Sequence, residues 1–419
     1  LNPNRNNFYD PMTLPDIEKA ILRIEKAIEN QEKVIIYGDY DVDGITSIAT
    51  LSKFLTELGI ENDYYLPNRL DEGYGLNNKA LDKIANSGTK LLITVDCGIS
   101  AYDEIEYAKS IGLEVIVTDH HEIPFDEVDG QKWYRIPDVD AVVDPKQEEC
   151  GYPFESICGA VVAYKVIQIL LDEALADKEL ITATLEELLE PAGIATVCDI
   201  MPLIDENRIF VKEAMKSLQN PKNPGISALM KANELDASKL TSFSIGFVIG
   251  PCLNATGRLD SAGLSLELLM AKSFEEAVPL ATTLKEYNAN RKEMTEKGVE
   301  KALVLLESGN YNTDRVLVLY LPDVHESLAG IIAGRIREKT GKPTFVLTKG
   351  EEGVKGSARS IESYHIYDEM TKCKQFFTKY GGHKMAAGLS MEEENVEAFR
   401  QAINDNCVLT DEDFEEKIT

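Results

Sequence analysis

The most constraining feature of the sequence is an apolar run that delivers three alternating carboxylates to a glycine. Residues 34–38 have the length and composition of a buried strand. Asp39, Asp41 and Asp43 follow, and residues 45–58 then carry the pattern of a helix. Carboxylates this close repel one another unless a positive charge lies among them, and a divalent cation is the common solution. A solvated, Asp-rich turn is the alternative interpretation.

The same arrangement returns twice. Residues 91–95 form a second apolar run before Asp96, and residues 114–118 form a third before His120 and His121. Helical patterns lie between these runs, so we expect parallel strands joined by crossover helices. Because parallel strands end at one sheet edge, the side chains should converge there. Mixed carboxylate and imidazole ligands suit Mn²⁺, with Mg²⁺ an alternative at oxygen-rich positions.

Two further carboxylates are candidates for the same centre. Asp199 lies in an otherwise apolar segment, and a buried, unpaired carboxylate is costly, so we predict that it also binds metal. Asp144 precedes Pro145, which is first of all a turn signal, although the carboxylate is a candidate ligand too.

Composition narrows the class of protein. The chain of 419 residues is long enough for two or three domains. Its formal net charge of −29 argues against a protein that coats nucleic acid by general electrostatics, but not against local binding. The sequence contains no run of eighteen apolar residues, so it predicts no membrane span. The 7 scattered cysteines indicate reduced thiols in a cytoplasmic protein.

The second half of the chain carries candidate substrate contacts. Residues 243–258 are expected to form a loop that offers Asn254 and Arg258. Residues 274–308 predict one long charged helix that bridges two lobes. A second α/β unit should follow from residue 311.

Two segments of that second unit have the composition of phosphate-binding sites. Residues 356–360 place Arg359 at a predicted strand end, and residues 381–388 combine glycines with His383. Backbone that allows close approach, together with a planar arginine, suits phosphate. A glycine-rich turn alone is equally a structural feature.

The ordered motifs resemble a known family. Residues 37–47, 96–98, 119–122 and 195–203 are similar to the successive motifs of the DHH phosphoesterase superfamily, and residues 381–383 resemble its associated DHHA1 domain. Within the superfamily the closest likeness is to bacterial single-strand-specific 5′→3′ DNA exonucleases, because residues 254–258 and 356–360 also match them.

The resemblance implies the roles of individual residues. It implies two ions, Mn²⁺ or Mg²⁺, and a catalytic role for Asp41, Asp96 and His121, with His121 facing the scissile phosphate. The implied metal ligands are Asp39, Asp41, Asp43, Asp96, His120 and Asp199. The implied substrate contacts are Asn254, Arg258, His325, Ser357, Arg359, Ser360 and His383.

The resemblance also implies an organisation. We expect an α/β protein with a parallel-sheet DHH domain at 1–220, a helical connector at 221–310, a DHHA1 domain at 311–408 and an acidic tail at 409–419, with a cleft between the two α/β domains. The exonucleases that it resembles continue into an oligonucleotide-binding barrel, whereas this sequence stops at Thr419, so we expect either a trimmed chain or a short form.

Two departures from the family pattern concern single residues. Tyr37 stands where many members have a histidine, which makes the filling of one metal position weaker or more dependent on Asp39. Val324-His325 replaces the usual Trp-His, and Ser327 replaces a glycine.

The expected function is hydrolysis of single-stranded DNA to 5′-mononucleotides in repair and recombination. Single-strand-binding protein and a helicase are the expected protein partners, with no membrane. One alternative is a phosphodiesterase for short RNA or cyclic dinucleotides, which the acidic charge and missing barrel favour. The other is an inactive replication scaffold, against which the intact Asp41, Asp96 and His120 argue.

Overall fold

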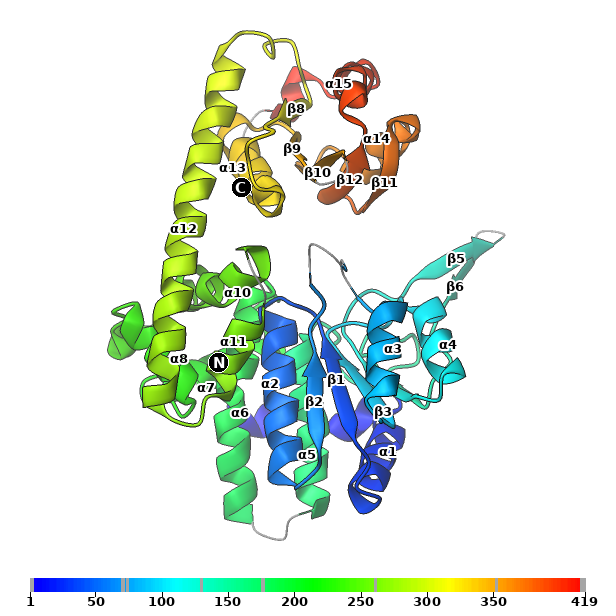
Figure 1. The fold of residues 1–419 in the computed structure, drawn as a ribbon, viewed down its shortest axis with the longest axis vertical. Coiled ribbons are helices and arrows are strands. Elements are labelled where there is room, and N and C mark those ends of the chain that lie inside the picture. The colour runs from blue at the N-terminus through cyan, green and yellow to red at the C-terminus, as the bar shows by residue number, and fades with distance from the viewer. Residues whose placement is uncertain are drawn as a thin grey trace. The chain divides into compact units, whose positions relative to one another are not determined.

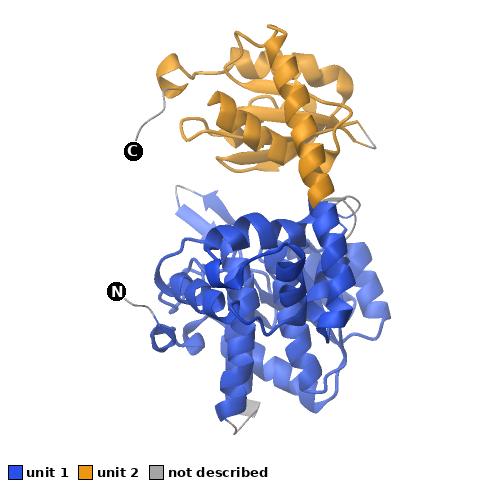
Figure 2. Ribbon diagram, turned by 90° about the vertical axis from the view of Figure 1, so that its left-hand side faces the viewer, with its two compact units in different colours: residues 1–288 blue, residues 289–419 orange. Residues whose placement is uncertain are grey.

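The computed structural model describes residues 4–68, 72, 75–128, 131–172, 178–255, 257, 262–350 and 353–414 in full, with the backbone alone for residues 173–174, 256 and 258–259. The chain divides into two compact units, residues 1–288 and 289–419, coloured separately in Figure 2.

The first unit is built on a parallel sheet of five strands in the order β2-β1-β3-β4-β7. Every neighbouring pair is parallel, so all five carboxyl ends lie along one edge. This confirms the predicted parallel sheet. The strands are β1 (Val34–Gly38), β2 (Asn62–Tyr65), β3 (Leu91–Val95), β4 (Glu114–Thr118) and β7 (Ala141–Val143).

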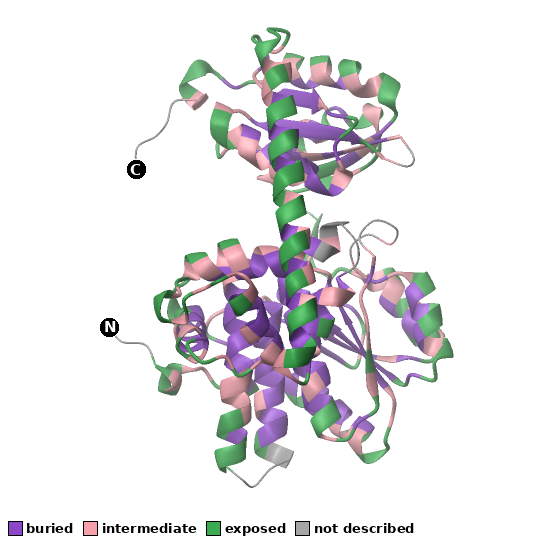
Figure 3. Cartoon of the chain, turned by 60° about the vertical axis from the view of Figure 1, so that its left-hand side comes forward, coloured by how far each residue is buried: buried purple, intermediate pink, exposed green. Residues whose placement is uncertain are grey.

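Helices cover both faces of this sheet (Figure 1). Alternate strand residues therefore enter two separate cores: Ile36 and Ile93 point into the larger one, whereas Ile35 and Leu92 point into the smaller one. β1, β3 and β4 are buried along most of their length, whereas β2, at the edge of the sheet, is only partly buried (Figure 3). The helices are α1 (Ile17–Glu29), α2 (Val42–Glu57), α3 (Asn78–Asn86), α4 (Tyr102–Ser110), α5 (Gly159–Ala174), α6 (Lys178–Cys198) and α7 (Asp205–Ser217).

Further helices extend the larger core. They are α8 (Pro224–Ala232), α9 (Ser242–Ser244), α10 (Gly250–Leu259), α11 (Gly263–Met270) and the start of α12 (Phe274–Glu307). The predicted loop at 243–258 is wrong, because α9, a π-helical segment (Ile245–Ile249) and α10 run on without a break. Ile245, Ile249 and Leu253 are buried and hold this helix to the core.

An exposed hairpin was not expected. It pairs β5 (Phe125–Val128) with β6 (Gln131–Tyr134), and every residue of both strands is exposed. The hairpin follows His121 by a short connection, and Figure 1 shows it projecting from the body of the first unit.

The second unit has a mixed sheet in the order β11-β12-β10-β9-β8. β8 and β9 are parallel, and the remaining neighbours are antiparallel. As predicted, α12 is one long helix, and it continues across the boundary between the units. The other elements are β8 (Leu317–Tyr320), α13 (Ala329–Thr340), β9 (Thr344–Lys349), β10 (Val354–Arg359), α14 (Ile366–Thr371), β11 (Phe377–Gly382), β12 (Ala386–Met391) and α15 (Val396–Asp405).

Among the described residues, we find no helix with the length and apolar character needed to cross a bilayer.

Candidate metal centre

The register of the parallel sheet aligns four carboxylates. Gly38 pairs with Val95, Val95 with Thr118, and Thr118 with Val143, which makes one row across four strands. The next residue on each strand is an aspartate. The aligned residues are Asp39, Asp96, Asp119 and Asp144. The sheet itself therefore collects negative charge along its carboxyl edge.

Helix ends hold two more aspartates at the same edge. Asp41 caps α2, because its Oδ1 accepts hydrogen bonds from the Asp43 and Gly44 amides at 2.9 and 3.1 Å. The Asp43 carboxylate accepts from the Gly159 and Ala160 amides at 2.6 and 2.8 Å, at the start of α5. The positive end of a helix thus fixes a carboxylate that is almost wholly buried.

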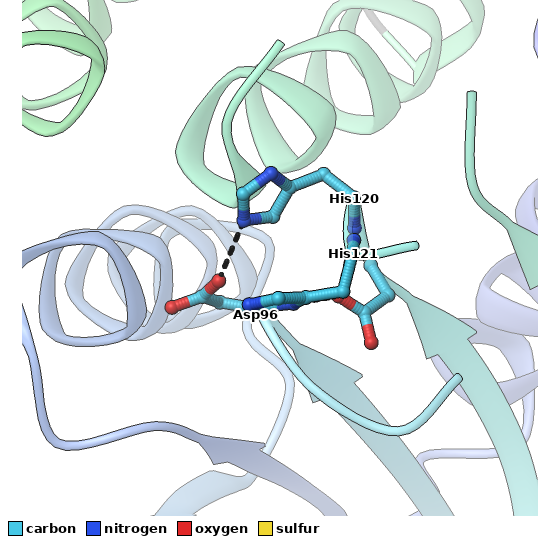
Figure 4. Close-up of side chains that lie close together, drawn as sticks. Asp96, His120 and His121 are labelled. Atoms are coloured by element: carbon cyan, nitrogen blue, oxygen red, sulfur yellow. Dashed lines mark hydrogen bonds and ion pairs between the residues drawn. The ribbon is translucent and has the colours of Figure 1, made fainter. Parts of the chain in front are cut away.

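His120 lies at the centre of the carboxylates. Its Nε2 is 3.0 Å from Asp96 Oδ1, 3.4 Å from Asp43 Oδ2 and 3.7 Å from Asp199 Oδ2. Figure 4 shows the imidazole of His120 directed at the Asp96 carboxylate. Burial lowers the pKa of His120, so the ring is neutral at physiological pH and can act as a ligand.

The predicted ligands come together with one addition. Three overlapping groups place one potential ligand atom from each member within 4.8 Å of the others. The groups are Asp39, Asp41 and Asp96; Asp43, His120 and Asp199; and Asp96, Asp119, His120 and His121. Asp119 was absent from the predicted site, although it directly precedes the two histidines and follows a buried strand as Asp39 and Asp96 do.

Asp119 orients His121. Its Oδ1 lies 2.7 Å from His121 Nδ1, and its Oδ2 accepts from the Ile99 amide at 2.9 Å. Burial alone would lower the pKa of His121, but the hydrogen bond and charge of Asp119 raise it to about 9. A protonated, half-exposed imidazole therefore stands at the rim of the acidic cluster.

The carboxylates destabilise one another. Burial raises the pKa of Asp96 well above its ordinary value, with added repulsion from Asp43 and Asp41. The pKa of Asp41 is raised by burial and by Asp43, and that of Asp199 is raised to about 8 by burial, Asp43 and Asp41. Carboxylates in so small a volume are ionised together only when a cation compensates their charge.

Two buried atoms support the same conclusion. His120 Nδ1 and Asp199 Oδ2 are inaccessible to water and have no hydrogen-bond partner among the residues that the structure describes. Buried polar atoms are nearly always satisfied in folded proteins. The donor set of carboxylate oxygens with imidazole nitrogen fits Mn²⁺ or Mg²⁺.

Close packing leaves no room for side chains at two glycines of the centre. A Cβ on Gly159 would stand 2.8 Å from Asp96 Cβ and 3.1 Å from Asp43 Oδ2. A Cβ on Gly44 would overlap the Asp39 backbone. Asp96 itself has a φ of 56°, a left-handed conformation that aspartate tolerates better than most residues.

Asp144 and Tyr37 lie near the centre without joining the groups above. Asp144 is fully buried, and burial together with Asp119 raises its pKa to about 7. Tyr37, which replaces the usual histidine, points into the smaller core and donates to the Gly75 carbonyl at 2.8 Å. Its hydroxyl therefore has a partner away from the carboxylates.

The predicted contacts in the second unit lie at one end of its sheet. Ser357 and Arg359 are two positions apart on β10. Arg359 pairs with Ala386 on β12, and the Ala386 carbonyl accepts a hydrogen bond from the His383 amide at 2.8 Å. Arg359 Nη2 lies 3.0 Å from the position of a Cβ on Gly330, near the start of α13.

His325 and Ser360 have internal partners. His325 caps the turn before α13, with Nδ1 2.7 Å from Ser327 Oγ, so Ser327 fills a structural role. Ser360 is buried and donates to the Tyr364 carbonyl at 2.6 Å, so its hydroxyl points into the fold.

In the first unit, Asn254 is half-buried on α10. The side chain of Arg258 lies outside the described residues.

Comparison with known proteins shows the class. The family model "DHH family, N-terminal domain" matches residues 33–192, and the "DHHA1 domain" model matches residues 313–408. The first unit, with its parallel sheet and acidic edge, thus contains a DHH domain, and the second contains a DHHA1 domain.

Relatives narrow the class to one family. Single-stranded-DNA-specific exonuclease RecJ of Bacillus subtilis is 37% identical over 97% of this chain, and the Escherichia coli protein of the same name is 36% identical over 93%. The chain spans 50% and 68% of these two relatives. A crystal structure of RecJ with Mn²⁺ from Thermus thermophilus has a TM-score of 0.79 at 28% identity, covering 94% of this chain and 54% of that one. A second crystal structure, of exonuclease RecJ bound to manganese, has a TM-score of 0.81 at 29% identity. This match covers 95% of this chain and 96% of that one. The chain belongs to the RecJ family.

Proposed function

We propose that this chain is a metal-dependent exonuclease that hydrolyses single-stranded DNA to 5′-mononucleotides. The observation that carries the proposal is the buried cluster of carboxylates around His120. The names of the relatives support the substrate class, and their Mn²⁺ and Mg²⁺ structures support the choice of metal. Catalysis is assigned to residues 1–220 and substrate binding to residues 311–408.

The proposed ligands are those that surround His120. They are Asp39, Asp41, Asp43, Asp96, His120 and Asp199. Two ions held there would neutralise phosphoryl oxygens and lower the pKa of a bound water.

The chain's own groups contribute the remaining steps. His121, kept protonated by Asp119, donates a hydrogen bond to a non-bridging phosphate oxygen as charge develops on it. Arg359 and His383 hold a phosphate from the second unit, and Asn254 contacts the strand from α10. The α5 amides keep Asp43 in place throughout.

The exonuclease is favoured over both alternatives. The relatives at 30% identity or more are named exonucleases, which gives no support to a cyclic-dinucleotide substrate. A scaffold without activity would gain nothing from crowding Asp41, Asp96 and Asp199 together, where burial and neighbouring carboxylates raise the pKa of each.

The test is degradation of end-labelled oligonucleotides with Mn²⁺. We expect a 5′-labelled single strand to release labelled mononucleotide at once, whereas a 3′-labelled strand shortens gradually, because we propose the 5′→3′ direction. Asp96→Ala should reduce the rate by several orders of magnitude. Near-parental degradation by pure Asp96→Ala protein would reject the proposed centre, and immediate release from the 3′-labelled end would reverse the polarity.

We also propose a cytoplasmic location and two protein partners. The described cysteines are all free thiols, which suits a reducing compartment. A single-strand-binding protein and a helicase would supply unpaired DNA in repair and recombination. Co-sedimentation of each purified candidate with this chain tests the partnership, and the absence of a complex at micromolar concentrations would reject it.

A further inference from the structure

Exposed apolar side chains lie on two segments close to Asp199, and we call them together the apolar ledge. Ile200, Leu203 and Ile204 follow Asp199 in the chain, and Phe243 and Phe247 lie on the helical segment that packs against Val197 and Cys198. The Phe243 and Phe247 rings are stacked, with centroids 4.5 Å apart and an interplanar angle of 19°, yet they remain 64% and 63% exposed. Ile200 is 89% exposed, and Ile204 61%. Burial of large apolar side chains stabilises folds, so this clustering on the surface calls for an occupant.

Backbone strain marks the same place. Ile200 has a φ of 57°, a left-handed conformation that is unfavourable for a β-branched residue. The exposed side chain gains no packing in return. The Phe247 ring is carried by a π-helical segment, a rare conformation that recurs at functional sites. Strain of this kind persists where function requires it.

One helix connects the ledge to the metal centre. Gly246, between the two phenylalanines, packs against Val197, with 3.4 Å from its Cβ position to Val197 Cγ1. Gly250 packs against Cys198, the residue before Asp199. At the far end, the Cβ position of Gly257 is 3.1 Å from the carbonyl of Tyr40, between Asp39 and Asp41.

The spacing suits a polymer. With a rise of about 1.5 Å per residue, Phe247 lies about 15 Å along the helix from Gly257. Figure 1 places α10 at the end of the first unit to which the strands of the sheet run. Phe247 lies one helical turn and Phe243 two turns from Gly250, which packs against Cys198, so a strand whose phosphate is at the metal centre needs further nucleotides to reach the rings.

We propose that this ledge is a stacking platform for the bases of single-stranded nucleic acid downstream of the scissile phosphate. The inference rests on the proposed function and adds a subsite to it. Aromatic faces stack on any base, which suits a binding site without sequence preference. Arg208 is exposed one turn beyond Ile204 and can pair with a phosphate.

The first experiment compares substrate lengths. We expect Phe243→Ala and Phe247→Ala to raise KM for a dT12 oligonucleotide about tenfold or more, with kcat unchanged, because each removes a stacking face. KM for a thymidine dinucleotide should not change, since it does not reach the ledge. Phe125→Ala, which removes another exposed ring from the same unit, is the matched control and should leave both values unchanged.

The second experiment identifies the group that stacks. For the parental chain, abasic residues at the downstream positions of the oligonucleotide should raise KM as much as combining Phe243→Ala with Phe247→Ala raises it for the intact oligonucleotide. In that double variant the abasic residues should cause no further rise. Phe247→Tyr should retain affinity, whereas Phe247→Leu should lose it. Equal tolerance of tyrosine and leucine would indicate an apolar protein contact and overturn the proposal.

The third experiment uses the strained residue. Ile200→Gly should raise the melting temperature, because glycine accepts a positive φ, and should raise KM for dT12 at the same time. A role in folding alone would not separate the two effects in this way.

Outcomes for the two proposals are distinguishable. If the parental chain hydrolyses no oligonucleotide with Mn²⁺, the proposed function fails. If the parent is active and both alanine variants keep KM for dT12 within twofold, or lose dinucleotide and dT12 turnover alike, only the platform is overturned.

Discussion

At the scale of single residues, the centre depends on small differences between chemically identical side chains. Asp43 accepts two amide hydrogen bonds, Asp119 binds an imidazole, and Asp199 is buried against other carboxylates. Hydrogen bonding and burial thus assign three aspartates to three roles. Substitution of one of these aspartates should therefore change the pKa of its neighbour in a predictable direction.

Asp119→Asn should lower the pKa of His121. Burial lowers that pKa, and the hydrogen bond and charge of Asp119 are the largest of the effects that raise it to about 9, so with a neutral amide the value should fall even though Asp199 and Asp43 still raise it. A smaller fraction of the imidazole would then be protonated at pH 7.5, and turnover should fall with it. NMR titration of the metal-free protein measures the shift, with Asp138→Asn, an exposed aspartate paired to Lys109, as the control. An unchanged His121 titration would refute the role of Asp119.

At the scale of elements, a buried ion pair ties an N-terminal segment to α5 and α7. Lys165 Nζ is 2.6 Å from Glu206 Oε1 and 3.0 Å from the Tyr9 carbonyl, and both charged side chains are fully buried. The Tyr9 amide donates to Glu206 at 2.9 Å, and the Tyr152 hydroxyl bonds to the same carboxylate. Gly159 begins α5, and Asp199 lies in the connection between α6 and α7, so the ion pair holds in place the elements that carry the site.

Lys165→Met should destabilise the first unit by about 3–5 kcal/mol, because it leaves the Glu206 charge buried without its partner. Urea denaturation measures the loss. Adding Glu206→Gln to this variant should restore part of the lost stability, since the amide carries no charge. As a control, Lys239→Met, at an exposed lysine, should change the free energy of unfolding by less than about 0.5 kcal/mol. A loss no larger than that of the Lys239 variant would show that the pair is not important for stability.

At the scale of the whole molecule, charge and metal determine stability together. Asp199 has a folded-state pKa of about 8 and Asp144 one of about 7, both above their ordinary 3.8. In the metal-free protein each folded carboxyl therefore retains a proton that the unfolded chain has released. This contribution is complete below pH 4 and is lost as the pH rises towards 8.

The free energy of unfolding of chelator-treated protein should therefore fall from pH 5 to pH 8, by up to about 1.4 kcal/mol per pH unit for each group. Mn²⁺ should stabilise the protein most at the upper end, because the ligands are then deprotonated. Thermal melts with EDTA and with Mn²⁺ across this range provide the measurement. Equal stability of the EDTA-treated protein at pH 5 and pH 8 would contradict the prediction.

Several features of the fold could be predicted from local sequence. Apolar runs that end in Asp39, Asp96 and His120 predicted parallel strands and a shared edge, because a buried strand has few alternatives to pairing. The long helix α12 was also predictable, because little in its sequence beyond Pro279 interrupts the helical pattern. Residues 243–258 misled because Gly250-Pro251 is typical of turns, while the packing that keeps them helical comes from distant residues.

The sequence by itself determined that carboxylates and histidines would gather where the strands end. Only the tertiary structure decided what each one does: the register put Asp119 and Asp144 in the same row, and the start of α5 supplied the amides that hold Asp43. The reason is that strand formation depends on neighbours along the chain, whereas charge, burial and hydrogen bonding at a site depend on neighbours in space.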